Sequence, residues 1–143
     1  MGNSSSLERV VELTSIMMAE MEAQAFQDER FAELSMRQIL YLSTIIHMEE
    51  PTFSDLAREL KVTKPSVTAL VGTLISKGYV RKVQDADDRR TYHILLTPKA
   101  REFNLLHEAV HKRLADFLAA QLDDDEVEQL ARLMTKALRG IHA

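Results

Sequence analysis

The chain has 143 residues, enough for one domain with a hydrophobic core. It contains no cysteine, so disulfides, thiolate metal sites and thiol redox switches are excluded. No apolar run approaches the roughly 18 residues of a membrane-spanning helix, and we expect a cytoplasmic protein without a membrane partner. The net charge of −4 argues against a nucleic-acid partner unless the positive charge is concentrated in one region.

Two helices and a loop are predicted in the first third of the chain. Residues 6–29 carry a broad apolar stripe with no Gly or Pro inside it, as an amphipathic helix does. Residues 35–47 form a second apolar pattern, and Ser35 has the short oxygen-bearing side chain that caps a helix. Residues 48–52 contain a proline and predict a loop.

Two shorter helices follow in close succession. Residues 53–60 predict the first, with Ser54 near its start. Thr63 caps the second, which runs to about Lys77, and Gly78 ends it in a left-handed conformation. This arrangement is typical of a helix-turn-helix, in which the second helix enters the major groove of DNA.

A β-hairpin and two long helices complete the chain. Residues 79–84 and 91–96 predict strands joined by a polar turn. Thr97 can cap the start of a helix that runs to about residue 121, and Pro98 is favoured at its first position. Acidic residues 123–126 favour the start of a last helix, which continues to about residue 139. The expected fold class is mainly α with a small β-wing.

Positive charge is concentrated between Thr52 and Lys99. This segment holds nine Lys/Arg and five Asp/Glu, a balance of +4. The remainder holds nine basic and 17 acidic residues, a balance of −8. A basic region on an acidic protein is the part that a polyanion would contact, so we expect double-stranded DNA as a partner.

The candidate DNA contacts fall on the second short helix and on the hairpin. Short polar side chains at a helix start can reach base edges and phosphates; here they are Thr63, Lys64, Ser66 and Thr68. The hairpin contributes four cations, Arg81, Lys82, Arg89 and Arg90. A narrow minor groove attracts an inserted arginine, and we expect Asp88 to orient one. The alternative is a solvated ion-pair cluster of the two tip arginines with Asp85, Asp87 and Asp88.

The segment SDLARELKVTKPSVTALVGTLISKGYVRKVQDADDRRTYHILLTPKA resembles the MarR family of winged-helix transcription regulators. The markers are the first short helix, the TKPSVT start of the second, the LISKGYVRK turn, the DADDRR tip and the closing LT. The resemblance adds Pro65 and Ala69 to the DNA-reading positions and assigns Arg90 to the minor groove. Many family members have arginine at the position of Ala69, so one potential guanine contact is missing here.

The resemblance also implies an organisation and a function. Residues 1–143 would form a single MarR-like domain, with a winged helix-turn-helix over 35–99 and a helical dimerisation region over 6–34 and 100–141. A homodimer would bind a pseudo-palindromic operator, usually as a repressor. No cofactor is required by this interpretation.

Members of the family commonly respond to a small aromatic or phenolic anion, and the equivalent segments could form its site here. Arg37 could pair with a carboxylate of such an effector. The apolar candidates for the walls are Met17, Met21 and Phe26 of the first helix and Met36, Ile39, Leu40 and Leu42 of the second. The default interpretation of each wall residue is ordinary core packing.

His107 and His111 are four residues apart, so both imidazoles lie on one face of a helix and could hold zinc. Zinc-sensing relatives carry a similar pair but need a third ligand from the second helix, where this chain has Ile39 and Leu40. Glu108 or Glu22 could replace it. We expect two solvent-facing histidines instead.

An enzyme is not expected, because the sequence has no phosphate-binding glycine loop, nucleophile motif or complete metal set. The alternative functions are a winged-helix module that binds another protein and a zinc-responsive regulator. The basic hairpin argues against the first of these.

Overall fold

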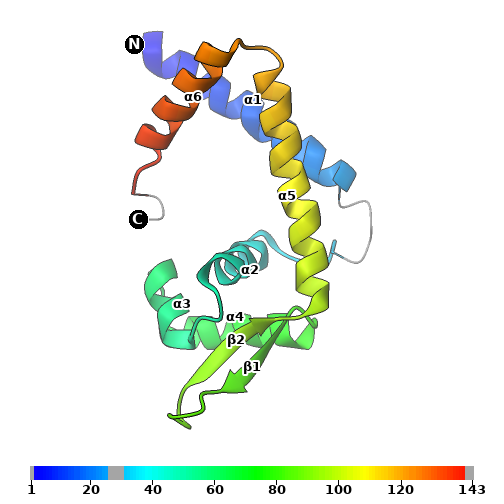
Figure 1. Ribbon diagram of the computed structural model, residues 1–143, viewed down its shortest axis with the longest axis vertical. Coiled ribbons are helices and arrows are strands. Elements are labelled where there is room, and N and C mark those ends of the chain that lie inside the picture. Colours follow the sequence, from blue (N-terminus) through cyan, green and yellow to red (C-terminus); the bar gives the residue numbers. More distant parts are fainter. Residues whose placement is uncertain (1, 26–30, 141–143) are drawn as a thin grey trace. The chain divides into compact units, whose positions relative to one another are not determined.

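The computed structural model describes residues 2–25 and 31–140, and the chain divides into two compact units (Figure 1). One unit, the head, comprises residues 29–105, and the other comprises residues 1–28 and 106–143. None of the described helices is long and apolar enough to cross a membrane.

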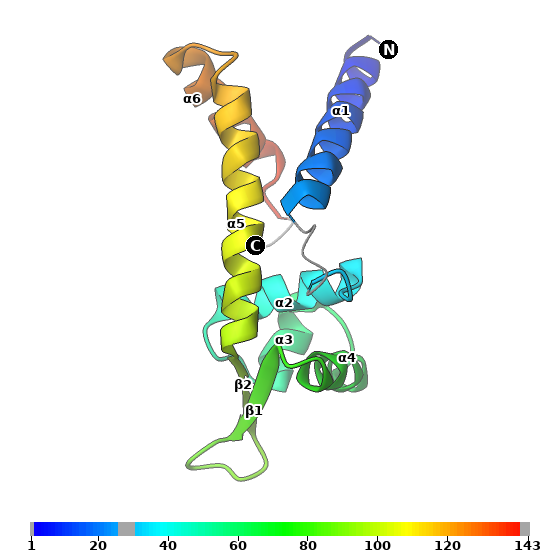
Figure 2. The same ribbon diagram turned by 90° about the vertical axis from the view of Figure 1, so that its right-hand side faces the viewer.

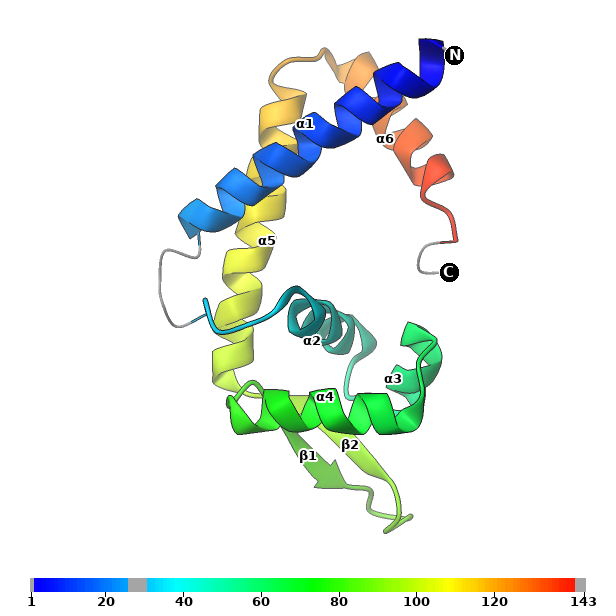
Figure 3. The same ribbon diagram turned by 180° about the vertical axis from the view of Figure 1, so that it is seen from behind.

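Three helices and a hairpin build the head. Their bounds are α2 (Met36–Met48), α3 (Phe53–Leu60), α4 (Lys64–Ser76), β1 (Val80–Gln84) and β2 (Tyr92–Leu96), and α5 (Pro98–Ala119) begins here. The strands pair antiparallel, and the hairpin projects beyond the helices of the head as a wing (Figure 2). Seen from the opposite side to Figure 1, α4 lies between α2 and the hairpin (Figure 3).

The helices of the head begin at short oxygen-bearing side chains. Ser35 caps α2 as predicted: its hydroxyl accepts a hydrogen bond from the backbone amide of Gln38, and the side-chain oxygen of Gln38 accepts one from the backbone amide of Ser35. The cap of α3 is Thr52, which forms the same reciprocal pair with Asp55. The helix spans residues 53–60 as predicted, but Thr52 was not identified as its cap. The Thr-x-x-Asp pair satisfies two helix-end donors at once.

The chain enters and leaves α4 at the predicted residues. The Thr63 hydroxyl accepts from the amide of Ser66 at 3.3 Å and caps the helix. Gly78 follows the helix with φ +83°, a conformation that glycine adopts without steric cost. A side chain on this residue would strain the turn that leads into β1.

The core of the head joins every element around an aromatic cluster. Phe31, Tyr79 and Phe103 are buried, and their ring centroids lie 5.8 to 6.4 Å apart. Fully buried aliphatic side chains from the helices and from β2 complete the core; these include Leu42, Ile45, Leu56, Val67, Val71, Leu74 and Ile94. This packing fixes α4 and the wing on one support.

Removing the hydroxyl group from each of two buried tyrosines of the head should change stability in opposite directions. The hydroxyl of Tyr41 is buried without a hydrogen-bond partner among the described residues, whereas that of Tyr79 donates to Glu33 at 3.1 Å. We expect Tyr41→Phe to leave the free energy of unfolding unchanged or raise it by about 1 kcal/mol. Tyr79→Phe, the matched control, should lower it by about 1 kcal/mol. Urea denaturation of both variants measures the difference; an equal loss in both would contradict it.

The other unit contains α1 (Gly2–Ala25), the rest of α5 and α6 (Asp124–Ala137). Our prediction began α1 too late, since the helix includes the serine-rich start, where Ser6 donates back to the carbonyl of Gly2. Its predicted end falls on residues 26–30, outside the described residues. Asp123 caps α6 and Glu126 completes the box, as the acidic run predicted. Of the side chains described in α1 and α6, none is buried.

Candidate nucleic-acid interface

The start of α4 presents the predicted reading residues to solvent. All six are exposed: Thr63, Lys64, Pro65, Ser66, Thr68 and Ala69. Their hydroxyls are partly engaged within the helix, since Thr63 and Ser66 share a hydrogen bond of 2.8 Å and Thr68 donates to the carbonyl of Lys64. Hydroxyl groups can accept further bonds in this state, and the helix N-terminus adds positive potential.

The tip of the wing is a turn held by its own aspartates. One carboxylate oxygen of Asp85 accepts the amides of Asp87 and Asp88, each at 2.9 Å. Asp88 in turn accepts the amide of Arg90 at 3.0 Å and lies 3.4 Å from Nε of the same residue. The predicted contact between Asp88 and Arg90 is therefore present, and the Arg90 side chain is 93% exposed.

The alternative of a shared ion-pair cluster at the tip fits only in part. Asp85 is engaged by the tip amides and by His93, whose Nε2 lies 2.7 Å from the carboxylate. The backbone carbonyl of Arg89 accepts a hydrogen bond from Gln84 at 2.8 Å, and its side chain is exposed. The tip thus presents two arginines outward while its carboxylates shape the turn.

A cleft of about 220 Å³ opens between the start of α3, the start of α4 and the wing. Three cations from different elements line it: Lys64, Lys82 and Arg90. Nζ of Lys82 also lies 5.1 Å from the ring centroid of Tyr92, so the ring helps to place it. Three cations around one opening suit a phosphate group of a nucleic-acid backbone.

Some residues of this cleft were not predicted from the sequence. Thr52 and Ser54, at the start of α3, and Tyr92 of β2 line it together with the cations. The Thr52–Asp55 pair could have been recognised in the sequence as a capping box, which marks the start of α3. The place of Tyr92 depends on strand register, which the sequence alone did not fix.

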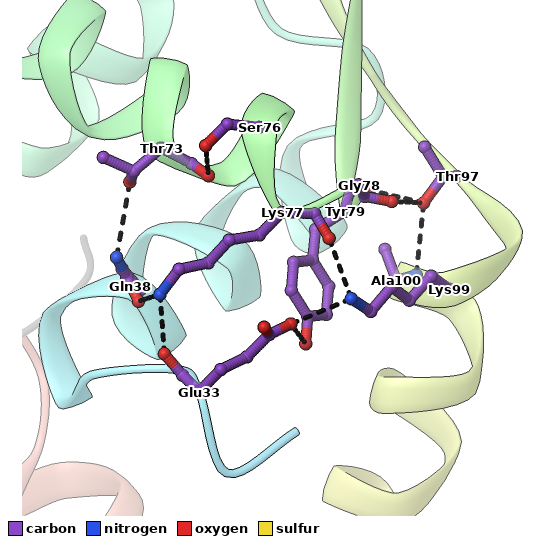
Figure 4. Close-up of polar contacts among 10 residues, drawn as sticks. All are labelled: Glu33, Gln38, Thr73, Ser76, Lys77, Gly78, Tyr79, Thr97, Lys99 and Ala100. Atoms are coloured by element: carbon purple, nitrogen blue, oxygen red, sulfur yellow. Dashed lines mark hydrogen bonds and ion pairs between the residues drawn. The ribbon is translucent and has the colours of Figure 1, made fainter. Parts of the chain in front are cut away.

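The far end of α4 is fastened by a polar network (Figure 4). Nζ of Lys77 donates to the carbonyl of Glu33 at 2.6 Å and to the side chain of Gln38 at 3.0 Å. Nζ of Lys99 bonds the Glu33 carboxylate at 2.8 Å and lies 4.5 Å from the Tyr79 ring centroid. The hydrogen bonds from Lys99 and Tyr79 lower the pKa of Glu33. The network joins the segment before α2, the end of α4 and the start of α5.

The predicted effector residues lie in separate units. Met17 and Met21 are half-buried on α1, and Met17 lines a hollow of about 450 Å³ with Phe117. On α2, Leu40 is 46% exposed, and Arg37 lines a hollow of about 360 Å³ beside α4. The candidate effector residues thus line two different hollows, one in each unit.

Two further residues that we predicted to line the effector site differ in their exposure. Leu42 is fully buried in the core of the head, so its assignment as an accessible wall was wrong and ordinary packing explains it. Met36, by contrast, is 76% exposed. Phe26 lies outside the described residues.

The two histidines of α5 approach each other as their spacing predicted. The ring centroids of His107 and His111 are 4.4 Å apart in an edge-to-face arrangement. Among the described residues, no group of three or more His, Asp or Glu side chains is placed to hold a metal ion. We considered Glu22 and Glu108 as the third zinc ligand. Neither completes a metal-binding group with the two histidines among the described residues.

A helix-turn-helix whose second helix is followed by a cationic two-stranded wing defines a winged-helix protein. Residues 33–91, from just before α2 to the end of the wing tip, match the MarR family. The HTH-type transcriptional regulator YhjH of Bacillus subtilis is 24% identical over 82 residues, which are 57% of this chain and 47% of YhjH, so the match spans about half of that relative.

Solved structures agree over nearly the whole chain. FabT of Streptococcus pneumoniae, crystallised in complex with DNA, has a TM-score of 0.82 at 24% identity, covering 97% of this chain and 96% of that one. A mutant of S. aureus MepR has a TM-score of 0.70 at 26% identity, covering 96% and 94%. Another MepR mutant, bound to an oligodeoxyribonucleotide, has a TM-score of 0.62 at 25% identity, covering 96% and 97%. Over residues 33–91 the chain is thus similar to the MarR family, and its fold is that of these solved structures.

Proposed function

We propose that the protein is a sequence-specific regulator of transcription that binds double-stranded DNA as a homodimer, usually to repress. The observation that carries this proposal is the cleft where Lys64, Lys82 and Arg90 converge beside the exposed start of α4. In this arrangement α4 enters the major groove, the cleft receives a backbone phosphate and Arg90 reaches the adjacent minor groove. Two proteins of similar fold have structures with nucleic acid: FabT in complex with DNA, and a MepR mutant bound to an oligodeoxyribonucleotide.

The unit that contains α1 and α6 supports the homodimer. Large apolar side chains are exposed there, including Leu7, Val10, Val11, Leu13 and Ile16 of α1, Leu130, Leu133 and Met134 of α6, and Leu138 directly after α6. An apolar surface on this scale is typical of a protein–protein interface. A second copy of the chain would cover it and would place two heads on half-sites about 10 bp apart, one turn of DNA.

Selection from random duplexes tests the proposal directly. The recovered sequence should be a pseudo-palindrome, and its affinity should fall by orders of magnitude between roughly 50 and 200 mM salt. A scrambled duplex of equal length is the control. Equal binding to both duplexes, or none at low salt, would favour the alternative in which the head binds another protein.

Lys64 lies at the first position of α4 and in the cleft, so its ammonium group should contact the DNA backbone or a base. We expect Lys64→Ala to weaken operator binding about tenfold and to lower the salt slope by about one. Lys136→Ala, which removes an equal charge from α6, should change neither. Fluorescence anisotropy at several salt concentrations measures both; full affinity in Lys64→Ala would place α4 differently on DNA.

A small aromatic or phenolic effector is part of the same proposal. The hollow lined by Met17 and Phe117 is mostly apolar, and the hollow beside α4 contains Arg37. Screening aromatic acids and phenols for release of the selected duplex tests it. Release that persists when Met17 is replaced by alanine and Arg37 by glutamine would exclude both hollows.

A further inference from the structure

His93 connects the wing to the loop that precedes α3. It lies on β2, opposite Val83 of β1, and its backbone forms an isolated bridge with Thr52. Its side chain is one-third exposed, and each ring nitrogen faces an oxygen. Nε2 lies 2.7 Å from the Asp85 carboxylate, and Nδ1 lies 3.1 Å from the carbonyl of Glu50.

This geometry is that of a protonated imidazole. A neutral ring donates from one nitrogen only, whereas the imidazolium donates from both, and here both partners can only accept. The hydrogen bond to Asp85 and that to Glu50 raise the pKa of His93. The same contact, with the amides of Asp88 and Asp87, lowers the pKa of Asp85 to about 2.

The charged groups that shift the pKa of His93 are acidic and raise it. Asp85 faces it from the wing tip, Glu50 from the loop and Asp55 from the first turn of α3. β1 contributes the apolar Val83 at the paired position. Three acidic residues near one imidazole favour its charged form.

The effect of this contact extends to the arginine at the tip. Asp85 holds His93 with one carboxylate oxygen and the amides of Asp87 and Asp88 with the other. Asp88 then accepts the amide and Nε of Arg90. A continuous chain of hydrogen bonds thus runs from the loop before α3, through His93 and Asp85, to Arg90.

We propose that His93 is a proton-operated latch of the wing: protonated, it holds the tip turn and Arg90 in the conformation that binds DNA, and on losing its proton it releases them. The DNA-binding part of this inference rests on the proposed function. Because the pKa of His93 is raised, the latch is fully formed below about pH 6.5 and is lost as the pH rises through the folded-state pKa. Asp85 has a lowered pKa, so its contribution is lost only under strongly acidic conditions.

NMR of the free, full-length protein tests the latch without DNA. His93 should titrate above about 6.5, and the amide signals of Asp87, Asp88 and Arg90 should shift with the same midpoint. In Asp85→Asn the remaining oxygen can still accept the tip amides, yet the midpoint of His93 should fall by about one pH unit or more. Tip amides that do not follow the titration of His93 would overturn the proposal, whatever the protein does with DNA.

Operator binding supplies the second measurement. We expect wild-type affinity to fall about threefold to tenfold between about pH 6 and pH 8, and the fall in His93→Gln to be less than half as large. His47→Gln is the matched control, because that ring also bonds a backbone carbonyl of the head. An equal fall in wild type and His93→Gln would overturn the latch, whereas an absence of DNA binding at every pH would overturn the proposed function instead.

Discussion

Replacing Arg90 by alanine should weaken operator binding by about tenfold or more and lower the slope of log affinity against log salt by about one. The side chain is almost fully exposed, and its backbone amide is fixed by Asp88, so the substitution removes a positioned cation and leaves the turn intact. A narrow minor groove concentrates negative potential, so we expect an inserted Arg90 guanidinium to contribute more to binding than any other side chain of the wing.

Two further variants separate charge from shape at this position. Arg90→Lys should keep the salt slope and still lose affinity for sites with a narrow minor groove, because an ammonium does not reproduce the planar guanidinium. Arg89→Ala removes the neighbouring cation and should have the smaller effect. Anisotropy titrations over a salt series measure all three; a slope unchanged in Arg90→Ala would place this side chain off the DNA.

Replacing Leu133 by glutamate should dissociate the proposed homodimer and reduce operator affinity by about a hundredfold or more. Leu133 is 52% exposed in the single chain, so a carboxylate there is solvated in the monomer but desolvated when a second copy covers α6. Loss of the dimer removes the gain from binding two half-sites at once.

Arg132→Ala is the matched control for this substitution. It changes the net charge of the chain by the same amount, and the 3.6-residue helical period places it on the side of α6 away from Leu133 and Leu130. Sedimentation equilibrium measures the assembly, and the same samples are titrated with the selected duplex. A stable Leu133→Glu dimer would move the interface away from this face of α6.

Local signals in the sequence predicted most of the head. Capping residues, the glycine after α4 and the alternating strands gave each element within a few residues, since these features depend on neighbours in the chain. The bounds of α3, residues 53–60, were predicted as observed. Its cap, Thr52, was not identified, although Asp55 three residues later completes the reciprocal pair.

Contacts between distant segments could not be predicted in the same way. His93 meets Glu50 across 43 positions, and Lys99 meets Glu33 across 66. Both depend on the register of the wing and on how the helices pack, which a single sequence does not specify. The sequence therefore predicts which cations are candidates for DNA contact, but it does not predict the distant residues that position them.

The fastening of α4 at one end has a consequence for the thermodynamics of recognition. Lys77 anchors the C-terminal end of the helix, whereas Lys64 lies at the N-terminal end, which we propose contacts DNA. Because its C-terminal end is already held in place, α4 should lose little configurational entropy when the protein binds DNA. Binding should therefore order the wing more than α4. Variants that loosen the clamp at Glu33 would then slow association or broaden sequence preference without touching any group that contacts a base.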